Sequence, residues 1–346
     1  MIWGDFVLIS GLILGLIFGF FLKRSRLCLS ASLRDIYLAK KISGLYWFLL
    51  IVLTTSTIFF FLLTFKLIPI PDQQVFSVSS EIVGGLFFGV GAALASGCVT
   101  TSLIKLGDGR VTGLVSIFGF VLFALATNQG PLSPLNNFMQ QNIVVTDNFR
   151  ASLNFNPLLI VAPLLVILVV FIWHEQKGKK TVYPVPASNQ KPLLRKKLNP
   201  FVTAGILGLV AGFGFYFSYQ TGRYGSVATL GPLLSWQIFF SSFPHHFDWG
   251  EMFVAGLVLG SLLFTVLNGE FSFKDYTGND LMKSFSGGAL MGFGAVMGKG
   301  CILANGIVGS AMLSAESLLN IVFITFGLWL GSYVIYVRPQ NKEKKL

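Results

Sequence analysis

The sequence contains few charged residues. Only 11% of its 346 residues are Asp, Glu, Lys or Arg, whereas soluble domains contain about 25%. Hydrophobic residues make up 53% of the chain, so a water-soluble globule would have to expose a large apolar surface. The composition therefore excludes an ordinary soluble domain and indicates a protein that is surrounded by lipid.

Cysteine and histidine are also scarce, with three of each. The cysteines lie far apart and form no C-x-x-C pair, so they define neither a disulfide framework nor a metal site. His174, His245 and His246 occur in polar stretches without metal-ligand spacing. A Walker-type phosphate-binding motif is absent as well. We therefore expect no metal, no cofactor and no nucleotide-driven motor.

Several apolar stretches are long enough to cross a bilayer, which takes about 20 residues in a helix. The first has no basic segment before it and no A-x-A-like cleavage site after it, so we expect it to remain as a helix. A further stretch, 226–242, contains Gly231-Pro232 and predicts a short or re-entrant helix. The sequence thus predicts an all-α polytopic membrane protein of about nine spans, at 5–22, 45–65, 81–104, 111–127, 157–173, 201–219, 251–268, 284–308 and 316–337.

Basic residues follow the loops between these spans and give a net charge of +11. In a soluble protein this charge would suggest nucleic acid, but basic loops beside apolar spans are typical of a membrane protein that faces anionic lipid. With the N-terminus outside, all Lys and Arg residues lie in cytoplasmic segments except Lys66, Arg150, Arg223 and Lys299. We predict a bacterial inner-membrane protein with a cytoplasmic C-terminus and no nucleic-acid partner.

Two glycine-rich segments resemble each other. IVGGLFFGVGAALASGCVTTSLI (82–104) and FSGGALMGFGAVMGKGCILANGI (285–307) share five glycines and a cysteine without a gap, and 11–20 resembles 208–217 more weakly. Because an odd number of spans separates the copies, they are expected to cross the membrane in opposite senses. Inverted repeats of this kind are a transporter architecture with a site near the midplane.

The stretch 174–199 is polar and contains three prolines, so it is interpreted as a cytoplasmic linker. It divides one transmembrane transport domain, 1–346, into a first half, 1–173, and a second half, 200–346. Cys28 of the first half has no cysteine partner in the second, because the weaker repeat places it opposite Gly225.

The repeated cysteines follow points at which a helix is expected to break. Ser96-Gly97 precedes Cys98, and Gly298-Lys299-Gly300 precedes Cys301. A helix that restarts at each cysteine would present free N–H groups to an anion, and the thiol would add a weak S–H donor. The alternative is that the glycines form a packing seam and the cysteines are small buried residues.

Other polar residues of the spans have two interpretations each. Lys299 is a functional candidate within a span, or a side chain that reaches a water-filled vestibule. Arg223 either attracts anions to the entrance or is simply exposed, and Asn305 hydrogen-bonds either the substrate or a neighbouring helix. Glu81 and Glu316 open apolar spans and are interpreted as interfacial residues, with a functional role as the alternative.

Five stretches resemble the signatures of the YeeE/YedE family, the bacterial thiosulfate-uptake membrane proteins, and the similarity extends over about residues 10–337. The stretches are RSRLCLSASLRD (24–35), ASGCVTTSLIKLGDG (95–109), GPLSPLNN (130–137), GPLLSWQ (231–237) and GKGCILANGIVGSAMLS (298–314). The resemblance implies an hourglass-shaped protein and a thiosulfate path along three thiols. It also implies a small cytosolic sulfur carrier of the TusA type as partner, while Lys299 departs from the small residue expected there.

We therefore expect a transporter of thiosulfate rather than an enzyme. The alternatives are a membrane sulfurtransferase, a scaffold for the cytosolic carrier, and a transporter of a selenium compound. The candidate substrate-binding residues are Cys28, Gly97, Cys98, Arg223, Lys299, Gly300, Cys301 and Asn305.

Overall fold

The computed structural model describes residues 2–69, 75–146, 157–177, 198–223, 225–241, 247–269, 271 and 276–338. Within these ranges the chain is helical apart from one antiparallel pair of short strands, β1 (Val75–Ser77) and β2 (Val144–Thr146). The helices are α1 (Ile2–Ser25), α2 (Leu29–Leu38), α3 (Ser43–Thr64), α4 (Val78–Leu94), α5 (Val99–Gly107), α6 (Val111–Asn128), α7 (Ser133–Gln141), α8 (Leu158–Lys177), α10 (Pro200–Gln220), α11 (Leu230–Ser241), α12 (Trp249–Asn268), α13 (Gly278–Met297), η1 (Ile302–Gly309), α14 (Ala315–Ser332) and η2 (Tyr333–Val337), η1 and η2 being π-helical.

The described helices confirm the prediction of an all-α polytopic membrane protein. Seven described spans, each a single helix or a helix together with the one that directly continues it, are long and apolar enough to cross a bilayer. Helix α13 with η1 forms an eighth span, which is bent by 42°. The remaining predicted span, 157–173, corresponds to the shorter apolar helix α8. The predicted short helix within 226–242 is α11. Most of the linker 174–199 lies outside the described residues.

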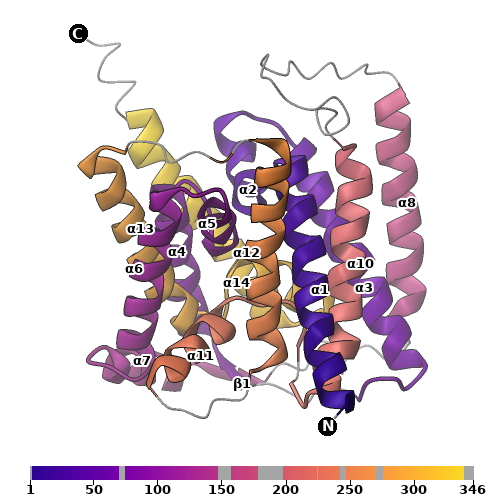
Figure 1. Ribbon diagram of the computed structural model, residues 1–346, viewed down its shortest axis with the longest axis horizontal. Coiled ribbons are helices and arrows are strands. Elements are labelled where there is room, and N and C mark those ends of the chain that lie inside the picture. Colours follow the sequence, from indigo (N-terminus) through magenta and orange to yellow (C-terminus); the bar gives the residue numbers. More distant parts are fainter. Residues whose placement is uncertain are drawn as a thin grey trace.

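The spans stand side by side, and their short companions lie toward the two ends of the bundle (Figure 1). The start of α1 is on the same side as β1, α7 and α11, whereas α2, α5 and the end of η2 are on the opposite side. Helix α8 stands at the edge of the bundle against α3, and its outward side chains, such as Leu159 and Ile167, are 73% and 64% exposed. Such an apolar outer face is suited to contact with lipid.

Helices α4 and α13 cross at a seam in which glycine brings the two backbones together. A Cβ atom on Gly84 would collide with the backbone nitrogen of Gly298, and one on Gly287 would lie 2.6 Å from the backbone nitrogen of Ala95. Gly287 is the repeat counterpart of Gly84, and Gly298 is the counterpart of Ala95, so the two contacts are equivalent under the repeat. Contact of this kind is the small-residue packing typical of membrane helices, which lack a hydrophobic driving force between them.

The remaining helix pairs are also equivalent under the repeat, in which α1 corresponds to α10, α3 to α12, α4 to α13 and α6 to α14. Helix α1 packs along α12 while α10 packs along α3, and α4 packs along α14 while α13 packs along α6. Each half of the sequence is thus interlocked with the other. Packing of this kind is what a two-fold axis through the α4–α13 seam would produce, while the hourglass outline stays a prediction.

Glycine at the centre of the seam should be required for stability. A Cβ atom on Gly91 would lie 2.6 Å from the carbonyl oxygen of Gly287 and 2.7 Å from the nitrogen of Met291, so the helices must separate in Gly91→Ala. We expect a destabilisation of about 1–3 kcal/mol, as for other overpacked sites, seen as a lower thermal transition in detergent.

The matched control is Gly205→Ala in α10, because a Cβ atom there meets nothing within 4 Å. This change should leave the thermal transition unaltered or raise it slightly, since alanine favours the helix. An equal transition temperature for both variants would show that the seam tolerates separation.

Candidate functional site

Each of the three cysteines stands immediately before a helix. Cys28 precedes α2, Cys98 precedes α5 and Cys301 precedes η1, all in an extended backbone conformation. None of the three helices has a side-chain cap at its N-terminus. The predicted restarts at Cys98 and Cys301 are confirmed, and Cys28 starts a helix in the same way. The first N–H groups of a helix have no partner within the helix, and the positive end of the helix dipole lies behind them.

The backbone turns in the same way before all three cysteines. The residue two positions earlier has a left-handed conformation, with φ of 54° at Arg26, 53° at Ser96 and 44° at Lys299. Residues other than glycine rarely adopt this conformation, and it is concentrated at functional sites where the surrounding structure imposes it. Sequence reasoning missed this common geometry because an arginine, a serine and a lysine share no chemistry that marks it.

The predicted glycines shape the turn before the repeated cysteines. Gly97 has φ of 152°, and a Cβ atom there would lie 2.7 Å from the Thr101 side chain. A Cβ atom on Gly300 would lie 2.8 Å from Oδ1 of Asn305. Glycine at these positions therefore allows the first turn of the following helix to fold back against the break.

A threonine joins two of the thiols. Sγ of Cys28 lies 3.1 Å from Oγ of Ser30 and 3.2 Å from Oγ1 of Thr101, which in turn lies 3.7 Å from Sγ of Cys98. Oγ of Ser30 also accepts a hydrogen bond of 3.2 Å from the backbone nitrogen of Cys98. The structure thus brings Cys28 and Cys98 together, and the hydroxyl groups that connect them were missed by sequence reasoning.

The third thiol also has a hydroxyl partner, from the segment between α10 and α11. Sγ of Cys301 lies 3.1 Å from Oγ1 of the fully buried Thr229, a residue that no motif pointed to. Cys98 interacts electrostatically with both Cys28 and Cys301, so the three thiols belong to one region of the molecule. Cys98 and Cys301 are each only 1% exposed, whereas Cys28 is partly exposed.

A lysine that was interpreted only as a topology signal lies beside the first break. Nζ of Lys105 donates hydrogen bonds of 2.8 Å to the carbonyl oxygen of Ala95 and 3.3 Å to that of Ser96. It thereby satisfies carbonyl groups that α4 leaves open at its C-terminus. The ammonium group also interacts electrostatically with Cys28 and Cys98, so the site contains a cation near two of the thiols.

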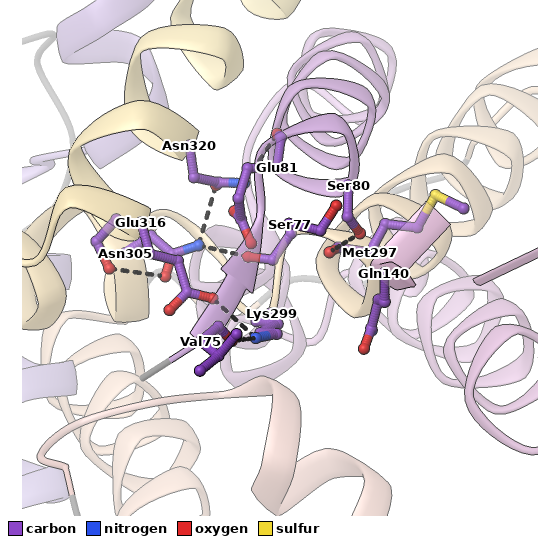
Figure 2. Close-up of polar contacts among 12 residues, drawn as sticks. Val75, Ser77, Ser80, Glu81, Gln140, Met297, Lys299, Asn305, Glu316 and Asn320 are labelled. Atoms are coloured by element: carbon purple, nitrogen blue, oxygen red, sulfur yellow. Dashed lines mark hydrogen bonds and ion pairs between the residues drawn. The ribbon is translucent and has the colours of Figure 1, made fainter. Parts of the chain in front are cut away.

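Asn305 connects the second break to helix α14. Its Nδ2 donates hydrogen bonds of 2.7 Å to the carbonyl oxygen of Gly298 and 3.0 Å to Oδ1 of Asn320, and its Oδ1 accepts one of 3.3 Å from Ser317. Of the two alternatives for this residue, the structure thus shows contact with a neighbouring helix (Figure 2). The amide holds the break in place.

Lys299 has its described contacts with β1 and α14 and not with the thiol of Cys301. Its Nζ donates a hydrogen bond of 3.0 Å to the carbonyl oxygen of Val75 and lies 3.4 Å from Oε1 of Glu316 (Figure 2). Glu316 is 9% exposed and Glu81 is completely buried. These carboxylates are therefore enclosed by protein, because β1, α14 and the broken end of α13 surround the start of α4, while their level at the membrane interface stays a prediction.

Arg223 lies apart from the described thiol contacts. Its Nη1 is 3.3 Å from Oδ2 of Asp248, the residue before α12, and the guanidinium also lies against Gly250. Burial lowers the pKa of the Arg223 guanidinium below its ordinary value, while the carboxylates of Asp248 and Glu251 oppose this shift. Arg223 therefore fastens the segment that leads to Thr229 onto α12.

Metal ligands do not gather at this site. Among the described residues there is no group of three or more His, Cys, Asp or Glu side chains that could hold a metal ion. His174 is exposed, and the other two histidines, 245 and 246, lie outside the described residues.

Bent and broken membrane helices whose ends meet inside the bundle define this chain as a multi-pass membrane protein of a transport type. The sequence profile of a family described as sulphur transport matches residues 24–330, and the chain belongs to this family, YeeE/YedE. It is similar to the thiosulfate transporter TsuA of Escherichia coli (strain K12), with 29% identity over 343 residues that cover 98% of this chain and 97% of the relative. It is also similar to the thiosulfate transporter TsuA of Spirochaeta thermophila, with 28% identity over 354 residues, 98% of this chain and 100% of the relative.

The thiols should differ in their reactivity toward a maleimide. Cys28 is partly exposed and should be modified first in the folded protein, whereas Cys98 and Cys301 should be protected until the protein is denatured. Mass spectrometry of peptides from single-cysteine variants measures the three rates. Modification of Cys98 at the rate of Cys28 would show that the buried pair is open to water.

Proposed function

We propose that this protein takes up thiosulfate across the bacterial inner membrane along the three thiols. The observation that carries this proposal is that three uncapped helices each begin at a cysteine whose thiol is already hydrogen-bonded to a hydroxyl group. The family and the thiosulfate transporters named above support the same function. The protein then acts as one transport domain with the N-terminus outside and the C-terminus in the cytoplasm.

The open helix ends and the thiols suit this anion. Backbone N–H groups at a helix N-terminus bind the oxygens of an anion. A thiol is a weak and polarisable donor, so it pairs well with the terminal sulfur of thiosulfate and poorly with strongly hydrated sulfate. The hydroxyl partners, Thr229 for Cys301 and Thr101 for Cys28 and Cys98, keep each thiol hydrogen-bonded before the anion arrives and after it leaves.

The order of the thiols follows from the predicted orientation. Cys301 stands after the break in α13, whose lysine contacts β1 on the outer side, and Cys28 starts α2 on the cytoplasmic side. The anion therefore meets Cys301 first, then Cys98 and finally Cys28. Each transfer exchanges one S–H hydrogen bond for another, which requires no movement of whole helices.

The membrane potential opposes this uptake. Moving a dianion into a cell at −100 mV costs about 4.6 kcal/mol, twice the cost of a single negative charge. Without a nucleotide-driven motor in the sequence, uptake must be driven by consumption of thiosulfate in the cytoplasm or by a coupled ion. A small cytosolic sulfur carrier of the TusA type is the proposed partner for the first route.

The sulfurtransferase alternative depended on Lys299 as an activating group for Cys301. The described contacts of Lys299 are with Val75 and Glu316, and the contact of Cys301 is with Thr229. A nucleophilic cysteine needs a base or cation within hydrogen-bond reach. We therefore propose that the protein is not an enzyme, and a persulfide trapped on Cys301 during turnover would contradict this.

Removal of either buried thiol should abolish uptake. The experiment measures radiolabelled thiosulfate in liposomes that contain the wild type, Cys98→Ala or Cys301→Ala, with Gly205→Ala as a control that meets no neighbour. We expect no uptake above empty liposomes for the two cysteine variants and normal uptake for the control. Normal uptake by the cysteine variants would remove the thiol path, and absence of uptake by the wild type would favour the scaffold alternative.

Loss of the lysine cation beside the first break should weaken the inner part of the path. In Lys105→Met the carbonyl groups of Ala95 and Ser96 lose their donor and the anion loses a nearby positive charge. We expect uptake to fall by at least about tenfold, or about 1.4 kcal/mol. Lys105→Arg should restore most of it, and equal loss in both variants would point to packing rather than charge.

A further inference from the structure

Two buried carboxyl groups face each other beside the second break. Glu81 and Glu316 belong to the first turns of α4 and α14, and their carboxyl groups are close enough to interact electrostatically. Figure 2 shows both side chains together with Asn305, Asn320 and Lys299. Oε2 of Glu81 accepts a hydrogen bond of 2.7 Å from Nδ2 of Asn320. Oε1 of Glu81 and Oε1 of Glu316 are both buried and have no hydrogen-bond donor among the described residues. The second of these atoms has only the ammonium group of Lys299 nearby, at 3.4 Å.

The charges around this pair do not balance without a proton. Among the described residues, Lys299 is the cation that faces the two carboxyl groups from the break between α13 and η1. The facing parts of α4, α14 and β1 contribute no further charged group besides the pair itself. Two carboxylates and one ammonium leave an uncompensated negative charge inside the protein, which is costly. One proton on the pair removes this charge and supplies the missing O–H donor between the two carboxyl groups.

Two amide side chains connect the pair to the break that precedes Cys301. Asn320 donates to Glu81 and accepts from Nδ2 of Asn305, which also donates to the carbonyl oxygen of Gly298. The ammonium partner of the pair, Lys299, is itself the left-handed residue of this break. A change of charge on the pair therefore acts both electrostatically and through these contacts on the turn that places Cys301.

We propose that Glu81 and Glu316 form a proton-binding site that is thermodynamically linked to anion binding at Cys301. The proposal rests on the proposed function for the identity of the anion. An anion that arrives at the break adds negative charge beside the pair and favours its protonated form. By the reciprocity of linked equilibria, a proton on the pair strengthens anion binding by the same factor. The only bond formed is O–H, with a proton taken from the outer solution.

The first experiment uses the wild-type protein alone. Sodium thiosulfate is added to detergent-solubilised protein in weak buffer between about pH 7 and 10, a range that spans the pKa of about 8–9 documented for buried glutamate. Binding and proton uptake are both measured calorimetrically in two buffers of different ionisation enthalpy. We expect up to one proton to be taken up per bound anion, and tighter binding at lower pH. Binding without proton uptake at any pH would overturn the proton site. Absence of thiosulfate binding would instead overturn the proposed function.

Neutral variants test whether the pair is the source of the bound proton. Glu81→Gln and Glu316→Gln each remove one titrating group at nearly constant shape, so binding should become independent of pH and proton uptake should disappear. Asp35→Asn is the matched control, because it makes the same chemical change on a 42% exposed carboxylate paired with Arg34. The control should keep the pH dependence of the wild type. Unchanged pH dependence in both glutamate variants would overturn the proposal.

The carboxyl oxygens of this pair could also bind a small cation such as sodium. A further experiment distinguishes a sodium site from a proton site. Binding of potassium thiosulfate in choline buffer is compared with binding in sodium buffer at one pH. Equal affinity in the two buffers is expected for a proton site. A sodium requirement that disappears in Glu81→Gln would overturn the proton assignment in favour of a sodium site.

Discussion

The constraint on which this structure depends is that backbone polar groups inside a membrane protein must find partners. Each broken helix leaves carbonyl groups on one side of the break and N–H groups on the other. The carbonyl side is closed by Lys105 at the first break and by Asn305 at the second. The N–H side at each cysteine has no side-chain cap. The protein thus closes the carbonyl half of each break with its own side chains, whereas the cysteine that begins the next helix does not cap the N–H half.

Much of the fold could be predicted because its causes are local or periodic. The length of the apolar stretches defined the spans, and the repeated Gly-Cys pairs at 97–98 and 300–301 located both breaks. The hydroxyl partners of the thiols could not be predicted in the same way. Thr101 lies 73 residues from Cys28 and Thr229 lies 72 residues from Cys301, and no sequence pattern marks either threonine as a partner of a distant thiol.

The burial of the carboxylates could not be predicted for a related reason. Glu81 and Glu316 open their helices, and hydropathy places the first turn of a span at the water interface. In the folded protein the start of α4 is covered by α14 and by the broken end of α13, which a reading of one span at a time does not include. Lys299 was singled out correctly as unusual, but its partner is a carboxylate rather than the adjacent thiol.

The two copies of the repeat are similar in backbone and different in chemistry. The left-handed position is Ser96 in the first copy and Lys299 in the second. The lysine that serves the first break is Lys105, and the corresponding residue of the second copy is Val308. A lysine therefore lies at each break, but Lys105 follows the first break in sequence whereas Lys299 is part of the second. The two copies thus share their packing, while different side chains surround the two breaks.

The interlocked helix pairs have a consequence for how the chain is made. Helix α1 finds its main partner, α12, only after residues 249–268 have been synthesised, and its Ser10 accepts a buried hydrogen bond of 3.1 Å from Trp249 of that helix. Helix α3 likewise waits for α10. The early spans must therefore rest in lipid, or against the insertion machinery, with these packing faces uncovered until most of the polypeptide has left the ribosome.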